Sequence, residues 1–340
     1  MIYRQIGNSG IDASVVAFGA WAIGGWMWGG TEEKASIDAL HAAFDNGINL
    51  VDTAPAYGFG RSEEIVGKAI TGRRDKLVIA TKCGLVWDKK EWAAGKGVFH
   101  FFSNEKGSTT ADDPKAFRVY KYLRPESIIT EVEASLKRLK TDYIDILQTH
   151  WQDESTPLDD TLAALIKLRE QGKIRSIGCS NAAPEQVAAY CKAGLDVDQE
   201  RFSLVDRQVE KNKIIDLCRE NNVSFFAYSP LANGLLTGKI TPERKFAEGD
   251  LRATRPRFAK ENLLKVSAML EKFKDIAQQN GLTYGQLIIA WTIGRYEKMH
   301  ALCGIRNANQ AAENAKAGEV ILAKDVVELI AKTADASGIS

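Results

Sequence analysis

The sequence predicts a (β/α)8 TIM barrel, in which eight parallel strands are surrounded by helices, with an N-terminal hairpin and extra C-terminal helices. Eight short apolar runs alternate with segments whose apolar residues recur at helical spacing, which is the pattern of this α/β fold. The first strand is not followed by Gly-x-Gly-x-x-Gly, the usual signature of the competing doubly wound sheet. Residues 1–340 therefore fit a single domain, because such barrels routinely reach about 250 residues or more.

The composition indicates a soluble globular protein. Hydrophobic residues make up 45% and charged residues 26% of the chain, and no apolar stretch approaches the about 20 residues that span a bilayer. Forty-five basic and 44 acidic side chains give a net charge of +1, which argues against nucleic acid and membranes as partners. The five cysteines are widely spaced, and the N-terminus lacks the apolar core of a signal peptide. We therefore expect free thiols, a cytoplasmic location and no metal site.

The individual elements are predicted from turn, cap and periodicity signals. A Gly-Asn-Ser-Gly turn at 7–10 between two extended runs predicts the hairpin. The first helix has a start signal at Thr31 and a closing glycine at Gly47. The expected strands are 14–21, 49–52, 76–82, 143–150, 174–181, 197–204, 223–230 and 300–305. The expected helices are 31–47, 62–70, 124–140, 158–172, 184–193, 209–222, 258–281 and 284–295, with two more after the last strand.

A long interval at about 84–124 interrupts this alternation. It shows little periodicity and is rich in glycine, charge and aromatic residues. So long a loop is uncommon in a compact domain and usually forms a lid, a binding loop or a disordered segment. Because it directly follows the third strand, we expect it at the rim where the strands end. Its aromatic and polar side chains are Trp87, Trp92, Phe99, His100, Phe101, Phe102, Arg118, Tyr120 and Tyr122.

Ionisable side chains lie where three of the predicted strands end. Asp52 ends the second strand and Tyr57 follows it, while Lys82 and His150 end the third and fourth. The carboxyl ends of barrel strands meet on one face, so these four side chains should converge. A phenol, with an ordinary pKa of about 10, is a poor proton donor near neutrality. A neighbouring ammonium held by a carboxylate would lower that pKa, which suits proton transfer at a carbonyl group.

With these four residues and several further motifs, the sequence resembles an aldo-keto reductase over essentially the whole chain. The motifs are Gly60-Arg-Ser-Glu63, Ser180-Asn181, the stretch 228–234 and the stretch 304–314. The sequence is most similar to the bacterial sugar- and aldehyde-reductase branch, which is itself similar to potassium-channel β subunits. The resemblance implies that Tyr57 is the general acid in carbonyl reduction, that Lys82, bonded to Asp52, lowers its pKa, and that His150 orients the carbonyl.

The resemblance also implies a nicotinamide cofactor that transfers hydride directly. It assigns the carboxamide to Ser180, Asn181 and Gln199 and the stacking of the nicotinamide ring to Tyr228. The residues that match the pyrophosphate loop are Ser229, Leu231, Asn233, Gly234 and Lys239. The residues that match the adenosine end are Gly304, Arg306, Gln310, Glu313 and Asn314. Arg306 has the delocalised charge that suits a 2′-phosphate, so we expect NADP(H), with NAD(H) possible if Arg306 only stacks on adenine.

For the substrate pocket we predict aromatic walls formed by Trp21, Trp26, Trp87 and Trp151. Aromatic faces with polar groups among them suit a sugar-derived aldehyde, whereas a purely apolar pocket would suit aryl or alkyl aldehydes. The alternative is that the 84–124 interval only shields the barrel or mediates subunit contact. We expect carbonyl reduction in carbohydrate metabolism by a monomer, with a homo-oligomer left open. The alternatives are an NAD(P)+-dependent sugar or polyol dehydrogenase and, less favoured, a cofactor-sensing subunit.

Overall fold

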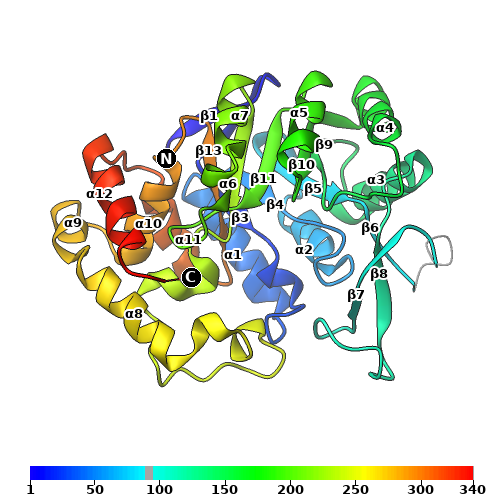
Figure 1. Ribbon diagram of the computed structural model, residues 1–340. Coiled ribbons are helices and arrows are strands. Elements are labelled where there is room, and N and C mark those ends of the chain that lie inside the picture. Colours follow the sequence, from blue (N-terminus) through cyan, green and yellow to red (C-terminus); the bar gives the residue numbers. More distant parts are fainter. Residues whose placement is uncertain (89–94, 340) are drawn as a thin grey trace.

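Eight parallel strands form a closed barrel in the computed structural model, which describes residues 1–88 and 95–339 (Figure 1). In order around the ring, the strands are β3 (Val16–Gly19), β4 (Leu50–Asp52), β5 (Val78–Cys83), β9 (Ile144–Thr149), β10 (Ile174–Ser180), β11 (Val197–Arg201), β12 (Ser224–Tyr228) and β13 (Met299–Gly304). The predicted fold class is confirmed, and the weakest strand signal, at 197–204, corresponds to β11.

An antiparallel hairpin precedes the barrel, as predicted. Strands β1 (Tyr3–Ile6) and β2 (Ile11–Ser14) pair in register from Tyr3 opposite Ser14 to Ile6 opposite Ile11. Ile6 and Ile11 pack into the same buried cluster as Leu50 and Phe226 from the barrel interior. The hairpin therefore closes the amino-terminal end of the barrel, which leaves the carboxyl ends of the strands as the open face.

Helices surround the barrel. They are α1 (Glu33–Asp45), α2 (Arg61–Ala69), α3 (Pro125–Leu139), α4 (Leu158–Glu170), α5 (Pro184–Lys192), α6 (Gln208–Lys211), α7 (Ile214–Glu220), α8 (Lys260–Glu271), α9 (Lys274–Gln279), α10 (Tyr284–Ile293), α11 (Ala308–Ala317) and α12 (Lys324–Asp335). Two expected helices are each split in two. The helix expected at 209–222 divides into α6 and α7 because Lys213 adopts a left-handed conformation, with φ of 64°. The helix expected at 258–281 divides into α8 and α9.

The interval at 84–124 contains a small antiparallel sheet where the sequence predicted a loop without regular structure. Strand β8 (Phe117–Lys121) pairs with both β6 (Leu85–Trp87) and β7 (Val98–Ser103). The sheet packs Trp87 and Phe117 against Ala56 of the segment after β4, and it projects from the side of the barrel opposite α8 and α9 (Figure 1). Trp92 lies outside the described residues.

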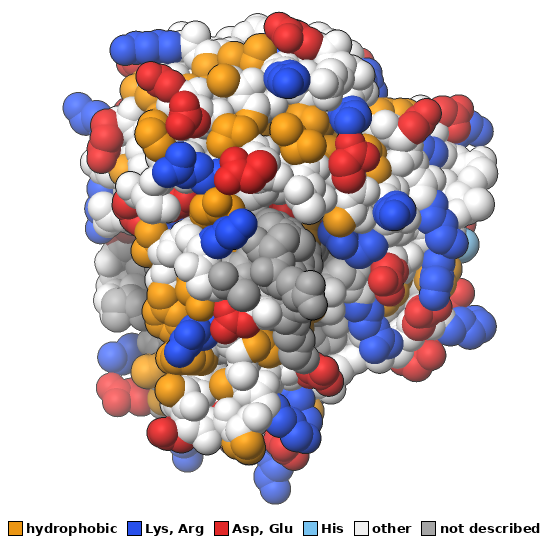
Figure 2. Space-filling model, turned by 90° about the vertical axis from the view of Figure 1, so that its right-hand side faces the viewer, with side chains coloured by type: hydrophobic (Ala, Val, Ile, Leu, Met, Phe, Trp, Pro, Cys, Tyr) orange, Lys and Arg blue, Asp and Glu red, His pale blue; other side chains and the backbone are white. Residues whose placement is uncertain are grey.

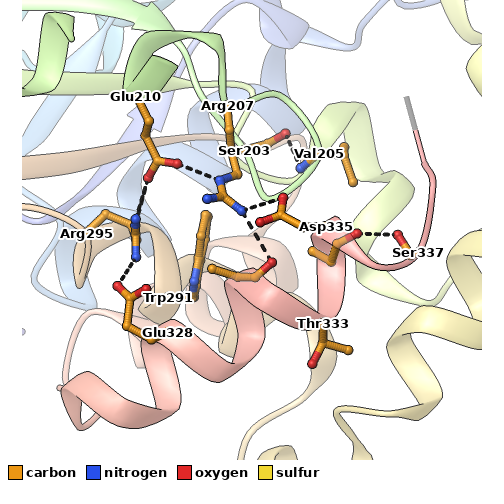
Figure 3. A network of polar contacts seen from close by, with 12 residues as sticks. Ser203, Val205, Arg207, Glu210, Trp291, Arg295, Glu328, Thr333, Asp335 and Ser337 are labelled. Atoms are coloured by element: carbon orange, nitrogen blue, oxygen red, sulfur yellow. Dashed lines mark hydrogen bonds and ion pairs between the residues drawn. The ribbon is translucent and has the colours of Figure 1, made fainter. Parts of the chain in front are cut away.

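The C-terminal helix α12 is tied to the barrel by a network of ion pairs (Figure 3). Glu210 accepts from Arg207 at 2.6 Å and pairs with Arg295 at 2.7 Å. Arg295 also binds Glu328, and Arg207 binds Asp335, both on α12. The network therefore holds the segment after β11 between α10 and α12.

Several global features can be stated for the described residues. Basic and acidic side chains are interspersed on the face drawn in Figure 2. No helix within residues 1–88 and 95–339 combines the length and apolar character that crossing a bilayer requires. The five cysteines are free thiols. In the same ranges, no group of three or more His, Cys, Asp or Glu side chains is placed to hold a metal ion.

Candidate active site

The structure brings Asp52, Lys82 and Tyr57 together at the open end of the barrel. Lys82 donates from Nζ to both carboxylate oxygens of Asp52, at 2.7 and 2.9 Å. The same ammonium donates to the Thr53 carbonyl at 3.0 Å and to the phenol oxygen of Tyr57 at 3.2 Å. Lys82 is 1% exposed and Asp52 is 3% exposed. The ion pair is therefore buried and in direct contact with the phenol.

His150 joins this group from the residue after β9. Its ring lies edge-on to the ring of Tyr57, with centroids 5.7 Å apart. Its backbone is held on both sides, because its N–H donates to the Cys83 carbonyl and its carbonyl accepts from Asn181 Nδ2 at 2.9 Å. The strand ends thus place an acid, an ammonium, a phenol and an imidazole at one site.

Two buried glutamines complete the contacts of Asp52. Gln148 donates to Asp52 Oδ2 at 3.2 Å, and Gln199 donates to the same oxygen at 2.8 Å. Gln199 is the residue that the resemblance assigns to the cofactor carboxamide, and its amide nitrogen is bonded to Asp52 in this structure. Gln148 is a residue of this site that was not predicted from the sequence. Strand alternation is the signal that points to it, since Gln148 and His150 are two residues apart and therefore share a face.

Burial dominates the electrostatics of the site. It raises the pKa of Tyr57 well above the ordinary value, and the charge of Asp52 raises this pKa further. This direction is opposite to the predicted lowering by Lys82, because removal of the phenol from water, which disfavours the charged phenolate, is the largest effect on this pKa. Burial also lowers the pKa of Lys82, against the charge of Asp52. The pKa of His150 lies well below its ordinary value through burial and the charge of Lys82. Near neutrality the site therefore holds a protonated phenol and a neutral imidazole.

The loop that carries Tyr57 is held by a close backbone contact between two glycines. A Cβ added at Gly58, whose φ is +67°, would lie 2.4 Å from the Gly24 carbonyl oxygen. A Cβ added at Gly24 would lie 2.7 Å from the Tyr57 carbonyl oxygen. Only glycine permits this approach, so the loop after β3 and the loop after β4 position the phenol together.

The residues assigned to the nicotinamide lie beside the catalytic group. Asn181, with φ of 53°, donates from Nδ2 to Ser180 Oγ at 3.1 Å as well as to the His150 carbonyl. Tyr228 donates its hydroxyl to Asn181 Oδ1 at 2.8 Å, and it packs at the top of the barrel interior. The ring of Tyr228 and the polar side chains of Asn181 and Ser180 therefore lie together, as a nicotinamide site would require.

The segment assigned to the pyrophosphate has a backbone suited to an anion. Ser229, Asn233 and Gly234 all adopt left-handed conformations, with φ of 56°, 60° and 91°. The Gly234 N–H bonds back to the Leu231 carbonyl at 2.9 Å. Backbone segments that include left-handed residues can form concave amide-lined anion sites. The left-handed residues are therefore compatible with an anion site, and the resemblance assigns the diphosphate of a dinucleotide to this segment.

The residues assigned to adenosine lie next to this segment, at the start of α11. Lys239 pairs with Glu313 at 2.6 Å, which joins the pyrophosphate segment to α11. Arg306 donates from Nη2 to the Gly30 carbonyl at 3.0 Å, and its N–H donates to Gln310 Oε1. The remaining assigned residues flank this turn, with Gly304 ending β13 and Asn314 buried on α11. The assigned cofactor residues thus extend from the catalytic group to α11.

Two of the four predicted pocket tryptophans lie in a packing cluster. Trp26 is 7% exposed, stacks on Phe101 and donates its indole N–H to Ser103 Oγ at 3.0 Å. Trp87 is 5% exposed, and its ring centroid lies 5.2 Å from that of Phe59. Trp87 belongs to β6 of the inserted sheet, and Trp26 packs on the same sheet through Phe101 of β7.

The other two tryptophans lie next to residues of the site, Trp21 beside Tyr57 in space and Trp151 directly after His150 in the chain. The ring centroid of Trp21 lies 6.2 Å from that of Tyr57, and its buried indole N–H has no hydrogen-bond partner in the part of the chain that the structure describes. Trp151 lies against His100, with ring centroids 4.8 Å apart. His100 follows Phe99 at an irregularity of β7, where a bulge redirects side chains. From the sequence, His100 could be recognised only as one aromatic or polar residue of the 84–124 interval. Its direction depends on the bulge, and a bulge depends on how the strands pair.

On the opposite face of β11 from Gln199, two carboxyl groups are buried against thiols. Asp198 is fully buried and accepts from the Cys179 thiol at 3.3 Å, with Cys218 Sγ at 3.9 Å. Burial raises the pKa of Asp198, and burial and the charge of Asp198 raise the pKa of Glu200. The folded protein therefore retains protons at these positions that the unfolded chain releases at lower pH.

This arrangement predicts that Asp198 makes stability fall with rising pH. A carboxyl whose pKa is raised on folding contributes stability that is present below the unfolded value of about 4 and is lost as pH rises towards the folded value. We expect Asp198→Asn to remove this dependence. The Tm of the variant minus the Tm of wild type should therefore become more positive between pH 5 and pH 8. Asp216→Asn, an exposed change on α7, is the control. A Tm difference for Asp198→Asn that is the same at both pH values would contradict the prediction.

Comparison with known proteins gives matches along the whole chain. The profile described as the aldo/keto reductase family matches residues 15–335. The NADH-specific methylglyoxal reductase of Escherichia coli (strain K12) is 39% identical over 338 residues, covering 97% of this chain and 98% of that protein. A probable voltage-gated potassium channel subunit beta of Arabidopsis thaliana is 31% identical over 337 residues, covering 94% and 92%. The solved structure of the glycerol dehydrogenase AKR11B4 from Gluconobacter oxydans has a TM-score of 0.84 and 34% identity, covering 99% of this chain and 96% of that one.

Proposed function

This chain belongs to the aldo/keto reductase family and is an NAD(P)H-dependent oxidoreductase, and we propose that it reduces a sugar-derived or other small aldehyde or ketone with NADP(H). The observation that carries the proposal is the buried contact of Tyr57 with the Lys82–Asp52 pair, with His150 beside the same phenol. The phenol carries the proton that carbonyl reduction requires, and the adjacent Lys82 can stabilise the phenolate that remains after the proton is transferred.

In this mechanism Tyr57 gives its proton to the carbonyl oxygen of the substrate. When bound, a nicotinamide cofactor supplies the hydride that the carbonyl carbon accepts. Lys82, 3.2 Å from the phenol oxygen, stabilises the negative charge that Tyr57 acquires. The neutral imidazole of His150 can donate a hydrogen bond to the same carbonyl oxygen. In alcohol oxidation these roles reverse, and Tyr57 acts as the base.

The preference for NADP(H) rests on Arg306. Arg306 lies just before α11, beside the residues assigned to adenosine, and its guanidinium donates to the Gly30 carbonyl. A guanidinium there suits a 2′-phosphate. The relative from Escherichia coli is named NADH-specific, so the test is kcat/KM with NADPH and with NADH. A higher kcat/KM with NADH than with NADPH would contradict the proposal that Arg306 binds the 2′-phosphate.

A second candidate, oxidation of a sugar or polyol with NAD(P)+, is favoured by the similarity to a structure titled glycerol dehydrogenase. We would assay NADPH with sugars, ketoses, aryl aldehydes and methylglyoxal, and NADP+ with polyols, following cofactor absorbance. Faster turnover in the reducing direction would support the first candidate, and turnover of polyols alone would support the second. Cofactor binding with no turnover in either direction would instead indicate a sensing subunit. The cytoplasmic location and the monomeric state are predictions from the sequence.

We propose that His100 and Trp151 form one wall of the substrate pocket. Burial and the charge of Lys121 lower the pKa of His100, so above pH 7 its neutral ring can bond a substrate hydroxyl. His100→Ala should lower kcat/KM for glyceraldehyde about 3- to 10-fold relative to propanal, the effect of one lost hydrogen bond. His41→Ala, on α1, is the control. An unchanged ratio of the two substrates in His100→Ala would reject this wall.

A further inference from the structure

Three arginines gather at the open end of β11 and β12 with one carboxylate among them. Asp206 accepts from both terminal nitrogens of Arg257, at 2.6 and 2.7 Å. Arg201, the last residue of β11, approaches the same carboxylate only to 3.9 Å. Arg255 is the N-cap residue of the turn Pro256–Phe258 that carries Arg257, and burial and the positive charges of Arg201 and Arg257 lower its pKa. One negative charge thus faces three positive charges.

Arg201 projects toward the mouth of the barrel. It lies two residues after Gln199 on β11, so the two side chains share a face, and Gln199 reaches Asp52 from that face. In the parallel register, Arg201 is the partner of Tyr228. Arg201 therefore lies on the same face of β11 as Gln199 and beside the aromatic residue assigned to the nicotinamide.

The hydrogen-bonding capacity of these arginines is only partly used. Arg201 Nε is buried and has no hydrogen-bond partner within the described part of the chain, although the side chain as a whole is 41% exposed. Arg255 forms no ion pair with a carboxylate of residues 1–88 or 95–339, and the charges that act on it are Arg201, Arg257 and Asp206. Partly buried guanidiniums that repel one another are stabilised by a bound anion.

The surroundings of the arginines are held firmly. Asp206 is bonded by Ser203 Oγ at 3.0 Å as well as by Arg257. The next residue, Arg207, is fixed by Glu210 in the network of Figure 3. The Asp206 carboxylate is therefore fixed in its contacts with Arg257 and Ser203, and it is not free to form a close ion pair with Arg201 or Arg255.

We propose that Arg201 and Arg255 bind an oxyanion, a phosphate or carboxylate group, carried by the carbonyl substrate. Guanidinium groups bind such anions through two parallel N–H bonds. The proposal rests on the proposed function and names its substrate class, an anionic aldehyde or ketone. The other source of an oxyanion is the cofactor, but its diphosphate and 2′-phosphate already have proposed sites at 229–239 and Arg306.

The test compares substrates that differ in charge. We would measure kcat/KM for succinic semialdehyde against butanal and for erythrose 4-phosphate against erythrose, in wild type, Arg201→Gln, Arg255→Gln and the double variant. The anionic-to-neutral ratio should exceed one in wild type and fall at least about tenfold in each variant. Arg219→Gln is the control, because Arg219 lies at the end of α7 that precedes β12, at the closed end of the barrel.

A binding measurement separates failure of this inference from failure of the proposed function. Succinate and inorganic phosphate would be titrated by calorimetry into wild type and Arg201→Gln, with and without NADP+, and NADPH affinity would be measured by tryptophan fluorescence. Anion binding to NADP+-loaded wild type that the variant loses supports the site, even if no carbonyl is turned over. Weaker NADPH binding in Arg201→Gln with an unchanged substrate ratio would assign the arginines to the cofactor and overturn the proposal. No anion binding and no charge preference in wild type would also overturn it.

Discussion

Replacing Tyr57 by phenylalanine is expected to lower kcat for carbonyl reduction about 10²- to 10⁴-fold, the usual contribution of a positioned general acid. The change removes the proton donor and leaves the ring, which packs against Trp21 and His150. Cofactor binding, followed by quenching of tryptophan fluorescence, should therefore be nearly unchanged. Steady-state turnover with NADPH and the best aldehyde of the panel gives the kcat.

Tyr296→Phe is the matched control for this variant. Tyr296 is also a buried tyrosine, and its hydroxyl donates to the Val223 carbonyl at 2.9 Å. It precedes β13, at the closed end of the barrel, so its loss should cost stability without removing turnover. Turnover by Tyr57→Phe within a few-fold of wild type would exclude Tyr57 as the proton donor.

Replacing Lys82 by methionine is expected to lower the free energy of unfolding by about 3–5 kcal/mol and to abolish turnover. The variant leaves the buried carboxylate of Asp52 without its cationic partner, and breaking one side of a buried ion pair has this cost. Among residues 1–88 and 95–339, the side-chain donors to the Asp52 carboxylate that would remain are the amides of Gln148 and Gln199. Urea unfolding measured near neutral pH gives the change in free energy.

The double variant Asp52→Asn with Lys82→Met separates stability from catalysis. Removing both charges removes the uncompensated carboxylate, so we expect most of the lost stability to return. Turnover should not return, because no ammonium would stabilise the charge on Tyr57. A double variant as unstable as Lys82→Met would show that the ion pair is not the source of the loss.

Residues at strand ends could be predicted from the sequence, because their placement depends only on local pattern and barrel topology. Asp52, Lys82 and His150 follow apolar runs, and parallel strands bring the ends of such runs to one face whatever fills the barrel. Asn181 and Tyr228 end other strands and reach the same face for that reason. The hairpin and the sequence of barrel strands also follow from local turn and periodicity signals.

Only the tertiary structure decided features that depend on contacts between distant segments. The inserted sheet pairs 85–87 with 119–121, and its bulge places His100 against Trp151, which no local pattern encodes. The two hydrogen bonds from Arg257 to Asp206 join a segment beyond β12 to the loop after β11. The direction of the Tyr57 pKa also required the structure, because it depends on burial and on the nearby charge of Asp52. Local pattern determines which face a side chain points to, whereas burial and partner identity are set by how the whole chain packs.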